Sequence, residues 1–242
     1  MVCIEEFELM TTGNQHTADA APPMPNTYRQ GAGCLFVAQS LGPSYPSRPL
    51  TPLEPMPTTP SLSDFFAYRF APGIVNHCLQ SATRSMKQGC PEETILACLL
   101  HDIGMNLMMV NHGWRSAQLV EPYVAEKVIW AIRYHQALRF YPDPSVGYEY
   151  PEMYRRIFGE NYVPPPYIEA AYTYARKHPW YMEARLITLH DDYSFDPTAK
   201  VSIEPFTDII GRHFKQPKVG LGYDIGPAAH MWRSLIYADY PL

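Results

Sequence analysis

The sequence has 242 residues, of which 46% are hydrophobic and 18% are charged, and its formal net charge is −5. This composition is typical of a globular protein rather than a disordered chain, and the length allows one large domain or two small ones. The negative charge argues against nucleic acid or an anionic membrane surface as the main partner, but a local arginine can still hold an anionic small molecule.

The cysteines and the apolar runs bear on the compartment. The five cysteines are odd in number and form no CxxC pair, so we interpret them as free thiols in a reducing environment. The first six residues lack the charged-then-apolar pattern of a signal peptide. The longest strongly apolar run, 95–100, is too short to span a bilayer. We therefore expect a cytoplasmic protein with no membrane partner.

The N-terminal part is rich in proline. Ten of the 25 prolines lie at or before Pro60, and the stretch 21–60 shows no helical periodicity. The sequence predicts an extended proline-rich arm over 1–60, followed by a helical domain over 61–242. The arm is either a wrapping tail or a docking motif for a partner.

Two helices are predicted at the start of the domain. The first covers about 74–88 and ends at Gly89, a residue that commonly terminates helices. The second begins at Pro91, since proline suits the first position of a helix, and runs to about 102 before stopping near Gly104.

Further helices follow along the chain, and no alternating strand pattern of useful length occurs. We expect a short helix over 112–119, a helix that opens at Pro122 and reaches His135, a long loop over 140–166, and helices over 167–177, 180–193, 204–214 and 227–237. The predicted class is all-α, with long loops of the kind that often carry function.

Six ionisable residues lie on or at the edges of different predicted helices: His77, His101, Asp102, His112, His135 and Asp191. Packed helices can aim such side chains at one point in the core of a bundle. Imidazole nitrogen and carboxylate oxygen together suit iron, zinc, manganese or related divalent ions. Because Asp102 directly follows His101 near a helix end, its carboxylate can reach across and bridge two metals.

Each of these residues also has a structural interpretation. A single histidine on a helix is more often a hydrogen-bonded core or surface group, and an aspartate near a helix end can act as a cap. However, two adjacent ionisable residues, His101 and Asp102, end a very apolar helix, where burying them unpaired would be costly. The closing ligand can be Asp191 or Asp192. Asp191 is preferred from its helical spacing, and His190 is expected to be structural.

The run 99–104, Leu-Leu-His-Asp-Ile-Gly, resembles the signature of the HD-domain superfamily. His77 fits the upstream ligand of that pattern, His112 and His135 resemble its third and fourth histidines, and Asp191 resembles its closing aspartate. The resemblance covers roughly 77–196, about half of the chain. It implies an HD-type helical bundle with two metals and with His101 and Asp102 at the catalytic centre.

The superfamily contains hydrolases, mostly of phosphate esters, and a smaller oxygenase branch. The oxygenases include myo-inositol oxygenase and enzymes that cleave the carbon–phosphorus bond of hydroxylated phosphonates. In that branch, four histidines and two aspartates hold two irons as a mixed-valent Fe(II)/Fe(III) pair. One iron chelates the substrate alcohol, and the other activates dioxygen.

Three residues bear on the choice between the branches. Met105 stands where many HD hydrolases place a lysine or a histidine, and methionine cannot donate a proton to a leaving group. Arg139 lies four residues after His135, where the phosphonate enzymes carry a lysine, and is predicted to bind an anionic group of the substrate. The phosphonate enzymes also carry a tyrosine and a glutamate before the first histidine. Ala67 and Phe70 occupy roughly those positions here, so the lid of those enzymes is not expected.

The leading hypothesis is a mixed-valent di-iron oxygenase that oxidises a small hydroxylated, anionic substrate with O2. The aromatic segment 140–154 either covers the site and excludes water or is a packed surface loop. One alternative is a phosphohydrolase that acts on a nucleotide or other phosphate ester with another divalent metal. A second alternative is a degenerate HD protein that binds a ligand or partner through the arm. The sequence leaves the substrate, the metal and homo-oligomer formation open.

Overall fold

The computed structural model describes residues 61–106 and 111–215, and these residues form helices joined by turns with no β-strand among them. The prediction of an all-α protein is therefore confirmed. The proline-rich arm and the helix predicted over 227–237 lie outside the described residues. Within them, no helix is long and apolar enough to cross a membrane.

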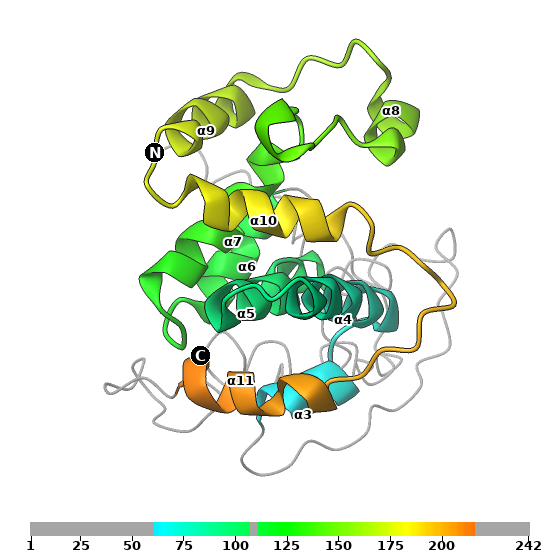
Figure 1. Cartoon of the computed structure of the whole chain (residues 1–242), viewed down its shortest axis with the longest axis vertical. Helices are drawn as coiled ribbons and strands as arrows, with labels where there is room; N and C mark the ends of the chain where they lie inside the picture. Colours follow the sequence, from blue (N-terminus) through cyan, green and yellow to red (C-terminus); the bar gives the residue numbers. More distant parts are fainter. Residues whose placement is uncertain (1–60, 107–110, 216–242) are drawn as a thin grey trace, which may run out of the picture.

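The described part contains nine α-helices and three short 3₁₀ helices (Figure 1). The α-helices are α3 (Leu62–Tyr68), α4 (Pro72–Lys87), α5 (Glu92–Leu100), α6 (His112–Val120), α7 (Glu126–Leu138), α8 (Glu152–Phe158), α9 (Pro166–Arg176), α10 (Tyr181–Asp191) and α11 (Thr207–His213). The 3₁₀ helices are η3 (Ile103–Asn106), η4 (Pro144–Val146) and η5 (Glu204–Phe206).

Helix α5 is the centre of the bundle. It packs against α4, α7, α10 and α11, and every residue from Thr94 to Leu100 is buried. A helix that is apolar on all sides must be surrounded by other helices. Burial of each leucine in it stabilises the fold by about 1.5–3 kcal/mol. The charged pair His101–Asp102 follows this helix directly, so the chain carries it into the core.

The other helices enclose this centre. Helix α10 packs on α7 and α4, and α6 packs on α7 and η3. In Figure 1, α10 crosses the molecule above the layer of α4 and α5, with α8 and α9 at one end and α3 and α11 at the other.

Most predicted helices occur, with boundaries shifted by a few residues. Helix α4 begins at Pro72, which supplies a preset first turn, and Gly89 follows its end at φ 71°, as expected for a terminating glycine. The predicted start of the next helix at Pro122 is wrong, because α7 begins at Glu126. Pro122 lies instead in the turn after α6, where the amide of Tyr123 donates to the carbonyl of Val120.

The long loop predicted over 140–166 is wrong in part, because it contains η4 and helix α8. Pro151 caps α8 at its start, and Gly159 ends it at φ 91°. The prolines and glycines that suggested a loop are therefore helix boundaries. None of the seven residues of α8 is buried, so this helix lies on the surface.

Helices α6 and α7 approach each other closely at a glycine. A Cβ on Gly113 would lie 2.9 Å from both Cε1 of His135 and the carbonyl oxygen of Ile132. A Cβ on Gly104 would lie 2.6 Å from the amide nitrogen of Ser116, whose hydroxyl accepts a hydrogen bond from the Gly104 amide at 2.8 Å. Both glycines allow backbone to pack where a side chain would not fit.

We predict that Gly113→Ala destabilises the protein by about 1–3 kcal/mol, because the added methyl group must displace His135 or the backbone of α7. Urea unfolding followed by circular dichroism measures the loss. Gly211→Ala is the matched control, since no atom lies within 4 Å of its Cβ position in α11. It should stabilise the protein by about 0.5–1 kcal/mol. Equal effects of the two substitutions would contradict the close approach.

Candidate metal centre

The six residues predicted as ligands meet in the middle of the bundle. His77 lies on α4, His101 and Asp102 directly after α5, His112 and His135 on α6 and α7, and Asp191 at the end of α10. All of them are buried except His112, whose side chain is 12% exposed. Helices far apart in the sequence thus bring four imidazoles and two carboxylates together.

The carboxylate of Asp102 is at the centre of this cluster, and its two oxygens face different histidines. Oδ1 lies 3.1 Å from Nε2 of His112, 3.4 Å from Nε2 of His135 and 3.6 Å from Nε2 of His101. Oδ2 lies 3.4 Å from Nε2 of His77. The carboxylate therefore stands between one imidazole, that of His77, and a group of three.

Asp191 completes the side of the cluster that faces α4. Its Oδ1 lies 3.1 Å from Nε2 of His77 and 3.9 Å from Nε2 of His101. The Nε2 atoms of His77 and His101 lie 3.2 Å apart. These three side chains form a compact group of two nitrogens and one oxygen.

The orientation of three imidazoles is set by the backbone. Nδ1 of His77 lies 2.9 Å from the carbonyl oxygen of Ser194. Nδ1 of His101 lies 2.7 Å from the carbonyl oxygen of Cys98, and Nδ1 of His135 lies 2.6 Å from that of Ile132. A carbonyl oxygen can only accept a hydrogen bond, so Nδ1 carries the proton in each ring. When Nε2 is unprotonated, each of these imidazoles presents its lone pair to the cluster, as metal-ligating histidines do.

The cluster has the chemistry of a cation site. Ligand atoms of His77, His101 and Asp191, and likewise those of His101, Asp102 and His135, lie within 4.8 Å of one another. Oδ1 of Asp102 and Nε2 of His135 are buried and make no hydrogen bond to the described residues. Buried polar atoms are rarely left without a partner, and a bound ion is one explanation. The buried histidines and aspartates can thus hold a metal ion.

The charges of the cluster are strongly coupled. Burial alone would lower the pKa of His77, but the carboxylates of Asp102 and Asp191 raise it to about 10. Burial lowers the pKa of His135 to about 4, although Asp102 opposes the shift. Burial raises the pKa of Asp102, but the surrounding histidines hold it well below its usual value. The carboxylates are therefore ionised at neutral pH, and a proton on His77 compensates part of their charge.

Arg139 supplies further positive charge. Its side chain is 3% exposed, its Nη1 contacts Oδ2 of Asp191, and its Nη2 lies 3.6 Å from Oδ1 of Asp192. Its guanidinium also lies 4.8 Å from the centre of the Tyr154 ring. Burial would raise the pKa of Asp191, but Arg139 and the histidines hold it well below its usual value. The arginine predicted to bind a substrate anion thus faces two carboxylates of the protein.

The two other candidates at the end of α10 point elsewhere. Asp192 faces Arg139, and burial raises its pKa. Nε2 of His190 lies 3.4 Å from the sulfur of Cys90. Asp191 is the aspartate of this pair that contacts the histidines of the cluster, and His190 packs behind it.

Aromatic side chains surround the cluster. The hydroxyl of Tyr148 donates to the carbonyl of Arg139 at 3.2 Å, and Tyr154 stacks on the guanidinium. The ring of Phe195 lies 4.5 Å from the imidazole of His77, at an interplanar angle of 20°. The sequence suggested that segment 140–154 lies over the cluster, but it did not suggest that Phe195 does. The position of Phe195, four residues after Asp191, is the sequence feature that could have indicated this contact.

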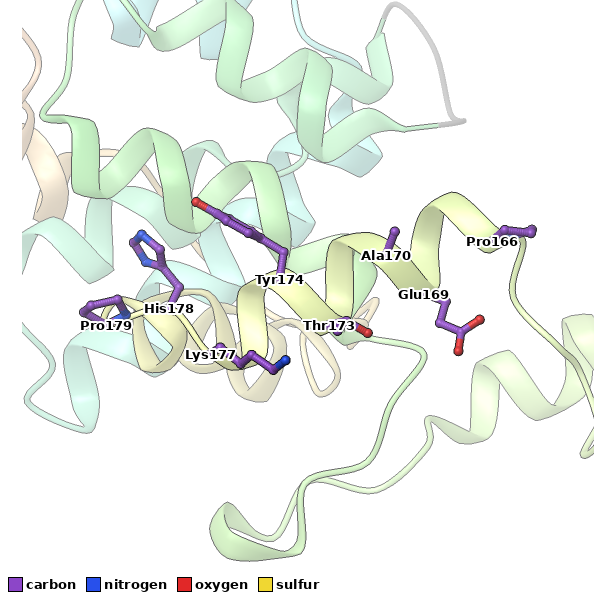
Figure 2. Close-up of a pocket in the computed structure, with 8 residues that line it drawn as sticks. All are labelled: Pro166, Glu169, Ala170, Thr173, Tyr174, Lys177, His178 and Pro179. Atoms are coloured by element: carbon purple, nitrogen blue, oxygen red, sulfur yellow. The ribbon is translucent and has the colours of Figure 1, made fainter.

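Two surface hollows differ in their relation to this cluster. One of about 710 Å³ lies along the outer side of α9, where Figure 2 shows Glu169, Thr173 and Lys177, and none of the six cluster residues lines it. Another of about 560 Å³ is lined by Asp192 and Phe195, which adjoin the cluster. Of these two hollows, the smaller is therefore the nearer to the candidate metal centre.

Neither models of known protein families nor the curated proteins give a match to this sequence. The resemblance to the HD superfamily consequently stays a prediction, and the function is argued from the cluster itself.

We predict that Arg139→Met destabilises the metal-free protein by about 3–5 kcal/mol, because it leaves the buried charge of Asp191 without its arginine. The loss should be smaller with a divalent metal added, since the metal supplies positive charge at the same carboxylate. Urea unfolding with and without metal tests both statements.

Arg156→Met is the control for this substitution. Its side chain is 75% exposed, and its Nε lies 3.6 Å from a carboxylate oxygen of Glu152. An exposed pair of this kind contributes about 0–1 kcal/mol, independently of the metal. An equal loss at both arginines, or a loss at Arg139 that metal does not reduce, would contradict the proposed contact.

Proposed function

We propose that this protein is a mixed-valent di-iron oxygenase of the HD-domain type, which uses dioxygen to oxidise or cleave a small hydroxylated substrate. The observation that carries the proposal is the position of Asp102. Its two oxygens face different imidazoles, at 3.1 Å from His112 and 3.4 Å from His77. This supports a two-metal centre with Asp102 as the bridge.

The donor set is compatible with iron. Four imidazoles and two carboxylates form a site of intermediate softness that suits Fe(II) and Fe(III), although zinc and manganese also fit such donors. His77, His101 and Asp191 would hold one iron, and His112 and His135 the other. When bound, the irons would supply the redox chemistry that activates dioxygen and a Lewis acid for the hydroxyl of the substrate.

The protein residues prepare this chemistry in three ways. The carbonyls of Ser194, Cys98 and Ile132 hold three imidazoles with Nε2 toward the cluster. Burial of His101 and His135 keeps bulk water away from the ligands, which an oxygen-activating centre requires. The proton that His77 carries without metal must leave when a metal binds, so metal binding becomes tighter as pH rises.

The proposed role of Arg139 in holding an anionic group stays a prediction. Its Nη1 contacts Asp191 and its Nη2 lies 3.6 Å from Asp192. A substrate anion would have to displace Asp192 from the guanidinium. The hydroxyl is therefore the substrate group on which the proposal depends.

Iron loading under anaerobic conditions, followed by partial reduction, tests the proposal. We expect about two irons per chain and a coupled half-integer-spin electron paramagnetic resonance signal that changes when a hydroxylated compound is added. Oxygen uptake should depend on that compound. In His101→Ala, the coupled signal and the oxygen uptake should be lost, because this imidazole lies in both groups of ligand atoms.

His213→Gln is the control histidine variant. His213 lies on α11 and contacts Glu92 at 2.8 Å on the surface, so its signal and oxygen uptake should equal those of the unchanged protein. If the active form instead holds zinc, manganese or magnesium and releases phosphate from nucleotides without oxygen uptake, the protein is a phosphohydrolase and the oxygenase proposal is wrong.

A further inference from the structure

The hollow of about 560 Å³ next to the cluster lies between α8 and the turn after α10. Helix α8 contributes Glu152, Met153, Arg156 and Ile157, and the turn contributes Asp192, Tyr193 and Phe195. Because α8 buries none of its residues and the turn is short, side chains from both segments are available to a ligand.

Two of these residues connect the hollow to the metal ligands. The ring of Phe195 stacks on the imidazole of His77, with 4.5 Å between the ring centres. Asp192 directly follows Asp191 and lies 3.6 Å from Arg139. A molecule in the hollow therefore contacts residues that adjoin His77 and Asp191, although none of the six cluster residues lines the hollow itself.

The lining is mainly apolar, and it is exposed. Ile157 is 63% exposed, Tyr193 is 64% exposed and Phe195 is 50% exposed. Single apolar side chains on a surface are common, but several around one hollow beside buried polar groups mark a binding surface. A ligand in the hollow can thus make dispersion contacts with these side chains and bury apolar surface against them.

The charges of the hollow do not favour an anion. Its ionisable side chains are Glu152, Arg156 and Asp192, so carboxyl groups outnumber arginines in the lining. Arg156 lies 3.6 Å from Glu152, and the buried Arg139, which does not line the hollow, faces Asp191 and Asp192. A phosphonate or phosphate group in the hollow would meet one arginine, and that arginine already contacts a carboxylate.

We propose that this hollow binds an apolar substituent of the substrate, with the hydroxylated carbon directed toward His77 and Asp191. The inference rests on the proposed function and narrows it. The substrate class is a hydroxylated compound with an apolar chain or ring, rather than a short hydroxylated phosphonate. Ile157 and Phe195 form the apolar contact.

Equilibrium binding to the anaerobic, iron-loaded protein tests this inference, with hexane-1,2-diol and 2-hydroxyethylphosphonate as the two probes. We expect calorimetry to show tighter binding of the diol. Ile157→Asp should weaken binding of the diol by at least about tenfold, because it places a charge against the alkyl chain. Val163→Asp is the matched control, since Val163 is 82% exposed outside the hollow and its replacement should leave binding unchanged.

Tighter binding of the phosphonate, no binding of the diol, or equal effects of the two aspartate variants would overturn the inference. These outcomes are separate from those for the proposed function. If the diol binds as expected but no oxygen uptake follows with any hydroxylated compound, the hollow is assigned correctly and the oxygenase proposal is wrong. If oxygen uptake occurs with the phosphonate alone, the proposal holds and the apolar assignment is wrong.

Discussion

The contact of one buried carboxylate, that of Asp102, with four imidazoles is the constraint on which this structure depends. A charge placed at the buried end of a helix is tolerated only if other groups compensate it. His77, His101, His112 and His135 supply the partners, each with Nε2 within 3.6 Å of a carboxylate oxygen. The positions of α4, α6 and α7 around α5 follow from this requirement as much as from apolar packing.

The same constraint links stability to the proposed chemistry. Without metal, Asp102 and Asp191 are compensated by a protonated His77 and by Arg139, whose Nη1 contacts Asp191. A metal would take over that compensation and release the proton from His77. Arg139 then has the role of holding Asp191 in place when no metal is present. A buried arginine four residues after His135, a candidate ligand, is consistent with this role as well as with anion binding.

The sequence predicted the grouping of the six side chains better than it predicted their surroundings. The adjacency of His101 and Asp102 after an apolar helix was informative because it has no simple packing explanation, and the six predicted residues lie together in the structure. Helix α8 was missed because Pro151 and Gly159 suggested a loop, although proline before a first turn and glycine after a last turn also delimit helices.

Other features depend on tertiary contacts that local pattern does not contain. The need for glycine at position 113 arises from the approach of His135 on another helix. The contact between Arg139 and Asp191 joins residues 52 positions apart (191 − 139), and the stacking of Phe195 on His77 joins residues still further apart. Sequence spacing placed Arg139 on the same side of α7 as His135, but the group that it would contact could be found only from the packing of α10 on α7.

The size of a surface hollow does not by itself locate a functional site in this protein. The larger hollow runs along α9 (Figure 2), and its lining includes Glu169 and Lys177 but none of the six cluster residues. The smaller hollow is lined by Phe195, which stacks on His77 of the cluster, and by Asp192, which lies 3.6 Å from Arg139. A reacting group must come within contact distance of the ligands, so adjacency to the cluster decides between them. For the same reason, the apolar side chains of α8, rather than those of α9, bear on the choice of substrate.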